Sequence, residues 1–186
     1  MGIEAELKAR LRDPARVREL LRQRAPEEVA IYSDTYFDTP DRTLTREGRE
    51  LRIRVIHADT TDRTVLTYKG AAVDEVSGSK PETETIADDA DALRAILAEL
   101  GFEVLIAFEK HCSNYRFTAS GRTLLATLVH VPELEQTYVE IESIVNTEAD
   151  IGPALDTIRA ILDELGIQRT EETTETYTDA VAAQRP

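Results

Sequence analysis

Charged residues alternate with apolar residues in several short segments, and this alternation constrains the fold more than any other feature. In the opening segment GIEAELKAR, Glu4, Glu6 and Lys8 fall on one side of the chain, and apolar residues fall on the other. A period of two predicts extended β-strands rather than helices. Other charged sets with this spacing are Arg52 with Arg54, Lys80 with Glu82 and Glu84, and Glu140 with Glu142.

Each charged face has two interpretations, an outer surface or the wall of a site. Alternation usually directs apolar residues to the core and polar residues to water. Like charges at adjacent positions on one face repel, so a solvated surface gains nothing from paired glutamates or paired arginines. A site does gain, because glutamates bind hard divalent cations, while arginine and lysine bind phosphate oxygens. If the strands formed a barrel with these faces inward, its lumen would suit a metal–polyphosphate complex.

Composition indicates one globular domain over residues 1–186, with a hydrophobic content of 41%. The net charge of −14 argues against nucleic acid or an anionic membrane as a partner. Cys112 is the single cysteine, so no intrachain disulfide forms, and no apolar leader is evident. We therefore expect a cytoplasmic protein. No apolar run approaches the length of a membrane span.

Local signals predict the elements around these strands. Asp13 and Pro14 are typical of a helix start, which predicts a helix over about 14–24. About eight short strands and three or four helices indicate a barrel or a strongly curved sheet. Tyr36 and Phe37 are expected to pack in the core. Asp34 and Asp38 flank a strand and a turn, which favours capping or Asx-turn roles for both.

Several of these segments resemble those of a known family. Glu4-Ala5-Glu6-Leu7-Lys8 is similar to the ExExK signature of the CYTH domain, that is, of the triphosphate tunnel metalloenzymes. Further segments follow in family order: DTYFDTPDRTLTREGRELRIR, LTYKG, KPETET, FEKHCSNY, YVEIE and ETYTDAV. The resemblance runs from about Ile3 to Ala180. It implies an α+β fold, in which eight antiparallel strands form a closed barrel, the triphosphate tunnel, with helices packed outside.

The resemblance also implies a ligand set, with triphosphate lying in the tunnel beside Mg²⁺ or Mn²⁺. Lys8 is also the candidate catalytic residue. The implied metal ligands are Glu4, Glu6, Glu140 and Glu142, with Glu82 and Glu84 as further candidates. The implied phosphate ligands are Lys8, Arg52, Arg54, Lys69 and Lys110.

Three positions depart from the family pattern and bear on activity. Lys80 and Cys112 stand where the family often has arginine, and Thr127 stands where it often has aspartate. We expect Cys112 to be a small buried residue rather than a reactive thiol. These changes leave open a protein that binds triphosphate or polyphosphate without turnover.

The family includes class IV adenylyl cyclases, thiamine triphosphatases and inorganic triphosphatases, and the same cage serves all of them. No adenine pocket is recognisable in the sequence, so we expect hydrolysis of an inorganic or organic triphosphate. Tripolyphosphate, ATP and thiamine triphosphate are the candidate substrates. The alternative is a class IV adenylyl cyclase that converts ATP to cyclic AMP and pyrophosphate. A homodimer is left open.

Overall fold

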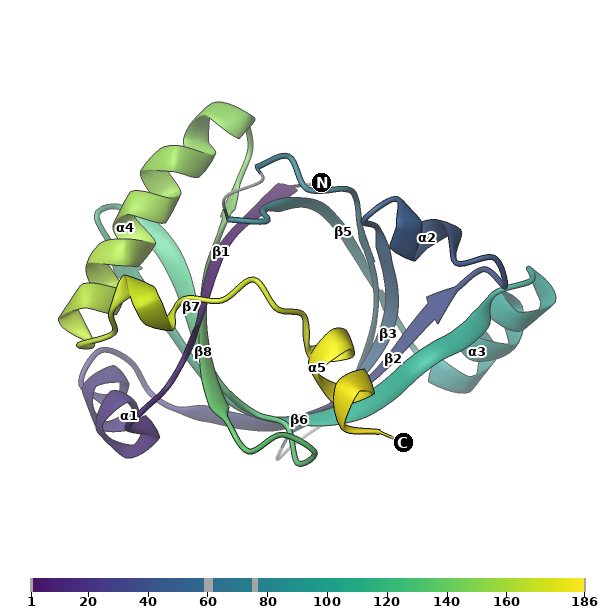
Figure 1. Ribbon diagram of the computed structural model, residues 1–186, viewed down its shortest axis with the longest axis horizontal. Helices are drawn as coiled ribbons and strands as arrows, with labels where there is room; N and C mark the ends of the chain where they lie inside the picture. The colour runs from purple at the N-terminus through teal and green to yellow at the C-terminus, as the bar shows by residue number, and fades with distance from the viewer. Residues whose placement is uncertain (1, 59–61, 75–76, 186) are drawn as a thin grey trace.

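Antiparallel strands close into a barrel, which Figure 1 shows in a view along the opening. The computed structural model describes residues 2–58, 62–74 and 77–185. Within these ranges, the eight strands neighbour one another in the order β1-β5-β4-β3-β2-β6-β7-β8, and β8 pairs with β1. The expected α+β barrel is confirmed. The strands are β1 (Gly2–Arg10), β2 (Glu28–Asp38), β3 (Glu50–Ala58), β4 (Arg63–Lys69), β5 (Lys80–Ala87), β6 (Glu103–Ala119), β7 (Arg122–His130) and β8 (Thr137–Val145).

The two ladders that hold β1 in the barrel differ in length. β1 pairs with β8 along most of its length, from Ile3 opposite Val145 to Arg10 opposite Tyr138. Its ladder with β5 has three residue pairs among the described residues, with Glu4 opposite Lys80 as the last of them. The barrel therefore closes through a short ladder.

Helices lie outside this barrel and connect its strands (Figure 1). Asp13 caps the first helix as predicted, because its carboxylate accepts a hydrogen bond from the backbone N–H of Arg16 at 3.0 Å. That helix ends at Arg22, slightly earlier than the sequence predicted. The helices are α1 (Pro14–Arg22), α2 (Thr43–Arg46), α3 (Ala90–Glu99), α4 (Ile151–Glu164) and α5 (Tyr177–Gln184), with 3-10 turns η1 (Glu148–Asp150) and η2 (Arg169–Glu171). No helix in the described ranges is long and apolar enough to cross a membrane.

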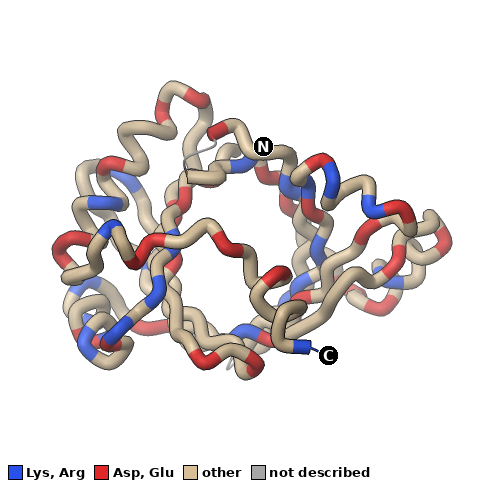
Figure 2. Tube along the Cα trace, in the orientation of Figure 1, with Lys and Arg blue, Asp and Glu red and all other residues tan. Residues whose placement is uncertain are grey.

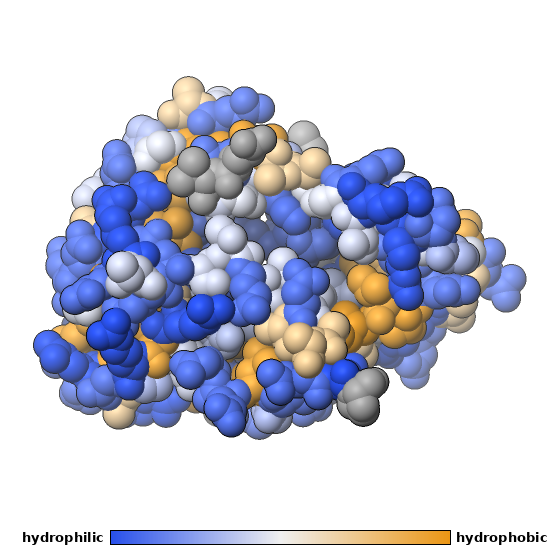
Figure 3. All heavy atoms as spheres, in the orientation of Figure 1, coloured by the Kyte–Doolittle hydropathy of each residue, from blue (hydrophilic) through white to orange (hydrophobic). Residues whose placement is uncertain are grey.

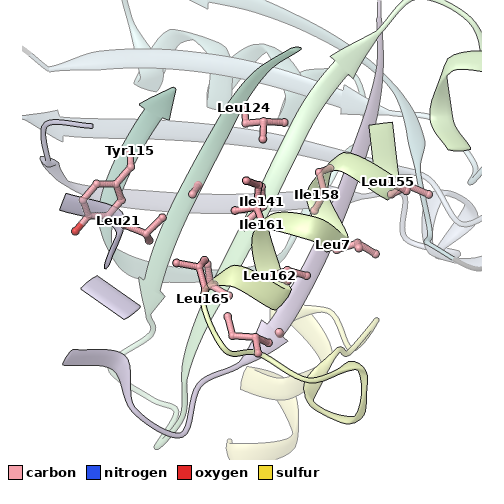
Figure 4. Packing of buried hydrophobic residues seen from close by; sticks show 14 of the residues in the cluster. Leu7, Leu21, Tyr115, Leu124, Ile141, Leu155, Ile158, Ile161, Leu162 and Leu165 are labelled. Atoms are coloured by element: carbon pink, nitrogen blue, oxygen red, sulfur yellow. The ribbon is translucent and has the colours of Figure 1, made fainter. Parts of the chain in front are cut away.

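The main hydrophobic core lies between the outside of the barrel and its helices. Figure 4 shows Ile158 and Ile161 of α4 packed beside Leu7 and Ile141 of the strands. Because α4 covers the apolar face of β1, the alternating charged face points into the barrel. The interpretation of the charged faces as a solvated outer surface is therefore wrong.

The aromatic pair Tyr36 and Phe37 is buried, as expected. Phe37 packs with Ile53 and Leu97 beneath α3. Tyr36 points the other way and stacks on Phe108, with ring centroids 5.7 Å apart. Adjacent residues of one strand thus contribute to two different cores.

A C-terminal segment crosses one mouth of the barrel (Figure 1, yellow). We call residues 172–178 the strap, and this mouth the strap end. The backbone N–H of Thr173 donates to the carbonyl of Lys8 at 2.9 Å. After the strap, Arg185 donates to the carbonyl of Ala107 at 2.7 Å and pairs with Glu133 at 3.0 Å. Side chains narrow this mouth further, as Figure 3 shows.

Candidate metal and phosphate site

The barrel encloses a cavity of about 780 Å³, and its wall carries both signs of charge (Figure 2). Lys80, Cys112 and Thr127 border the same space. The structure therefore brings together every residue that the sequence placed in one site. These residues are Glu4, Glu6, Lys8, Arg52, Arg54, Lys69, Glu82, Glu84, Lys110, Glu140 and Glu142.

A cluster of carboxylates forms one part of the wall. Glu4, Glu6 and Glu142 each offer an oxygen, and these oxygens lie within 4.8 Å of one another. Glu6 and Glu142 face each other in the β1–β8 ladder, so the register brings them together. An all-oxygen donor set of this kind fits a hard divalent cation such as Mg²⁺ or Mn²⁺. We call these three residues the acidic cluster.

Burial and mutual repulsion disturb the protonation of the acidic cluster. Burial, with the nearby charges of Glu140 and Glu4, raises the pKa of Glu6 to about 8. Burial, Glu4 and Glu6 also raise the pKa of Glu142 well above its ordinary value. Burial acts in the same direction on Glu4, but Lys69 outweighs it and lowers the pKa of that carboxyl. Without a cation, the cluster therefore holds protons near neutral pH, and a divalent cation would displace them.

This protonation predicts how the stability of the metal-free protein depends on pH. The folded pKa of Glu6 is raised, so its contribution is complete below the ordinary pKa and is lost as pH rises through about 8. We expect the free energy of unfolding in EDTA to fall between pH 5 and 9, by on the order of a few kcal/mol. Urea unfolding across this range measures it. Glu6→Gln should reduce this dependence of stability on pH, whereas Glu19→Gln, at an exposed position of α1, should not. Equal pH dependence in the wild type and both variants would show that the pKa of Glu6 is not raised.

Cations form the opposite part of the wall and surround Asp34. Arg54 donates to both carboxylate oxygens of Asp34, at 2.6 and 2.7 Å. Arg52 and Lys110 lie 4.0 and 3.7 Å from the same carboxylate. Although burial opposes it, these cations hold the pKa of Asp34 far below its ordinary value. Arg52 also lies 3.8 Å from Glu84, so two carboxylates face three cations, and the remaining positive charge suits phosphate oxygens.

The prediction for Asp34 is therefore wrong, and that for Asp38 is confirmed. Asp34 lies in the middle of β2, opposite Arg54 in the β2–β3 ladder, and it is 1% exposed. Asp38 ends β2 and accepts hydrogen bonds from the backbone N–H groups of Leu44 and Thr45, at 2.9 and 3.0 Å. The alternation of strand faces could have placed Asp34 in the cavity, because Asp34 lies on the same face of β2 as Tyr36, which points inward.

Two lysines of the cavity wall pair with carboxylates. Lys69 contacts Glu4 and also lies 3.1 Å from Glu82. Lys80 pairs with Glu50 at 2.6 Å, so the lysine at this departure from the family pattern still carries its charge into the cavity. A bound phosphate would compete with these carboxylates for the same ammonium groups.

The strap adds an aromatic ring that sequence reasoning did not place in the site. The ammonium groups of Lys8 and Lys110 lie 4.6 and 4.0 Å from the centroid of the Tyr177 ring. The Tyr177 hydroxyl is buried and has no hydrogen-bond partner within the described residues. Burial and the nearby carboxylate of Glu140 raise the pKa of Tyr177, which keeps the hydroxyl neutral.

Cys112 and Thr127, the other two positions that depart from the family pattern, carry no charge. Burial raises the pKa of Cys112 to about 12, so it is the buried, unreactive thiol that we expected. Thr127 donates to Asn114 at 3.0 Å, and Tyr32 donates to the same amide oxygen at 3.1 Å. This part of the wall is polar and uncharged.

Comparison with known proteins identifies the family. A sequence model of the CYTH domain matches residues 2–177. The chain belongs to the CYTH family. This CYTH protein is 26% identical to a protein of Methanocaldococcus jannaschii named "Putative adenylate cyclase", over 90% of this chain and 91% of that one.

Solved structures share its fold. The PH1819 protein of Pyrococcus horikoshii is 28% identical, with a TM-score of 0.84, over 98% of this CYTH chain and 99% of that one. HpAC1 of Hippeastrum is named "Putative adenylyl cyclase", and a dominant triphosphatase activity is described for it. It is 20% identical, with a TM-score of 0.66, over 100% of this chain and 97% of that one, so the likeness concerns the fold alone.

Proposed function

We propose that this CYTH protein binds a triphosphate with Mg²⁺ or Mn²⁺ in its barrel and hydrolyses it. One observation carries the proposal: a single cavity places the acidic cluster of β1 and β8 across from the cations around Asp34. A triphosphate is a dense anion that needs cations along its length and a metal ion to neutralise its remaining charge.

Each part of the wall has a role in this proposal. The acidic cluster would hold the divalent cation, with Glu82, Glu84 and Glu140 as further candidates. When bound, that cation supplies charge neutralisation and polarises phosphoryl oxygens. Arg52, Arg54, Lys69 and Lys110 would donate hydrogen bonds to phosphate oxygens. Their positive charge would stabilise the charge that develops in the transition state.

Lys8 is our candidate catalytic residue. It lies on the same face of β1 as Glu4 and Glu6, with Glu140 opposite it in the β1–β8 ladder. The Tyr177 ring restricts its ammonium group from the strap side. Lys8 therefore lies between the candidate metal ligands and the strap end, where it could contact a terminal phosphate.

Two other functions would use the same cage. The name of the Methanocaldococcus jannaschii relative favours an adenylyl cyclase, in which a substrate hydroxyl attacks the α-phosphate. The neutral cluster at Cys112 and Thr127 favours a binder without turnover. Hydrolysis remains our proposal, because no adenine pocket is recognisable in the sequence and the acidic cluster that would hold the metal ion is intact.

One assay with two substrates tests the proposal. The pure protein is incubated with Mg²⁺ or Mn²⁺ and either tripolyphosphate or ATP, and the products are identified by chromatography. We expect release of orthophosphate and no cyclic AMP. Cyclic AMP and pyrophosphate from ATP would show a cyclase instead. Metal-dependent binding of tripolyphosphate without any product would show a binder.

A further inference from the structure

The three histidines of the chain lie in one row across four neighbouring strands. They are far apart in the sequence, at positions 57, 111 and 130. Ile31 of β2 lies opposite His57 of β3 in one ladder and opposite His111 of β6 in the other. His111 in turn lies opposite His130 of β7. Because residues opposite each other in a ladder project from the same face, the strand order gathers histidines that the sequence separates.

Two of these histidines, His111 and His130, form a pair of exposed imidazoles outside the barrel. Lys110 and Cys112 border the cavity, so His111, which lies between them on β6, points away from it. Both imidazoles are exposed, and their ring centroids lie 6.2 Å apart with the ring planes at 72°. Within the described residues, neither ring makes a hydrogen bond or an ion pair. The ring nitrogens are therefore accessible to a ligand from solution.

The separation of these two rings fits the binding of one metal ion by both. A zinc ion lies about 2.0–2.1 Å from a histidine nitrogen, so two imidazoles on one ion have ring centroids roughly 5–6.5 Å apart. The observed separation of 6.2 Å falls within this range. The β6–β7 ladder fixes both backbones, so side-chain rotation is enough to aim one nitrogen of each ring at a common point. Imidazole favours Zn²⁺, Cu²⁺ and Ni²⁺, whereas Mg²⁺ and Mn²⁺ prefer oxygen ligands.

His57, the third histidine of the row, lies in a different environment. Its Nδ1 lies 2.9 Å from a carboxylate oxygen of Asp62. The strand that carries Ile31 separates it from His111, which places the two backbones roughly 9–10 Å apart. His57 is therefore an exposed histidine of the same row that does not belong to the pair.

We propose that His111 and His130 form a chelating site for a borderline divalent transition-metal ion such as Zn²⁺, on the outer face of the barrel. The ion would join β6 to β7, with water completing its coordination. Glu109, an exposed residue on the same face of β6, adds negative charge beside the pair. This site is separate from the acidic cluster and does not depend on the proposed function.

Calorimetry with Zn²⁺ tests the site. The dissociation constant is measured for the protein without a histidine tag, as wild type, His111→Gln and His130→Gln. Removal of an outer-shell partner alone costs 10–100-fold in metal affinity, so loss of one of two ligands should weaken Zn²⁺ binding by at least about tenfold. Both side chains are exposed, so the variants should fold, and circular dichroism checks this.

Two control proteins define what the loss of affinity means. His57→Gln removes the exposed histidine outside the pair and should leave Zn²⁺ binding at this site unchanged. Glu4→Gln/Glu6→Gln removes carboxylates inside the barrel and should also retain it. Loss of this affinity in the glutamine variant of the acidic cluster would place the ion in the cavity and overturn the outer site.

Nuclear magnetic resonance of the wild type identifies the bound rings without any substitution. On addition of Zn²⁺, the imidazole signals of His111 and His130 should shift together, while those of His57 should not. Unchanged Zn²⁺ affinity in either variant of the pair, or an equal loss in His57→Gln, would overturn the chelating pair. Absence of Zn²⁺ binding by the wild type would overturn it as well.

Discussion

We expect replacement of Glu4 and Glu6 by glutamine to abolish the proposed metal-dependent turnover of a triphosphate. The double variant leaves Glu142 as the single carboxylate of the acidic cluster. With two of its three carboxylates gone, the cluster should bind a divalent cation much more weakly. Loss of charge neutralisation by a metal is worth several kcal/mol in the transition state, so the rate should fall by at least about a thousandfold.

Direct metal binding and folding must be measured alongside the rate. Binding of Mn²⁺ by calorimetry should disappear in the double variant and persist in Glu19→Gln, a change on the exposed face of α1. Circular dichroism must show that the double variant is folded, because glutamine at position 4 also removes a counter-ion of the buried Lys69. Retained Mn²⁺ affinity in a folded double variant would rule out the acidic cluster as the metal site.

Asp34→Ala should destabilise the protein by about 3–5 kcal/mol, because it leaves Arg52, Arg54 and Lys110 without their buried counter-ion. Urea unfolding at pH 7 measures this cost. The low folded pKa of Asp34 means that its contribution is present above the ordinary pKa of an aspartate and is lost as pH falls below it. The difference between variant and wild type should therefore shrink in acid.

A buried aspartate on the same strand provides the matched control. Asp38→Ala removes hydrogen bonds at the start of α2 and should cost about 0.5–2 kcal/mol. Tripolyphosphate should restore stability to Asp34→Ala more than to Asp38→Ala, because bound phosphates replace the missing negative charge among the cations. Equal effects of tripolyphosphate on both variants would show that the cations around Asp34 do not bind phosphate.

The sequence predicted the placement of the charged residues because strand parity is a local rule. Once one face of β1 is covered by α4, Glu4, Glu6 and Lys8 must point inward. The alternation along one strand does not specify, however, which residues of other strands each side chain contacts. The pairing of Lys69 with Glu4 depends on the order of strands around the barrel, which brings β5 between β1 and β4.

The residues that sequence reasoning missed depend on contacts between distant segments. A position beside a turn favours a capping or Asx-turn role for Asp34, but in the structure cations on β3 and β6 stabilise its carboxylate within β2. Tyr177 follows a threonine-rich segment with no strand or helix pattern of its own. Its place over Lys8 and Lys110 results from the path of the strap across the barrel.

The barrel closes at the junction of β1 and β5, which we call the seam, through its shortest ladder among the described residues. Only three residue pairs join the two strands in the described part of the chain, so their hydrogen bonds are the easiest of the wall to break. Glu4 lies on one side of this seam and Lys80 and Glu82 on the other. A metal–triphosphate complex bound at this place would tie both edges together. We therefore expect the backbone amides of this junction to exchange hydrogen faster in the empty barrel than in the barrel with bound triphosphate.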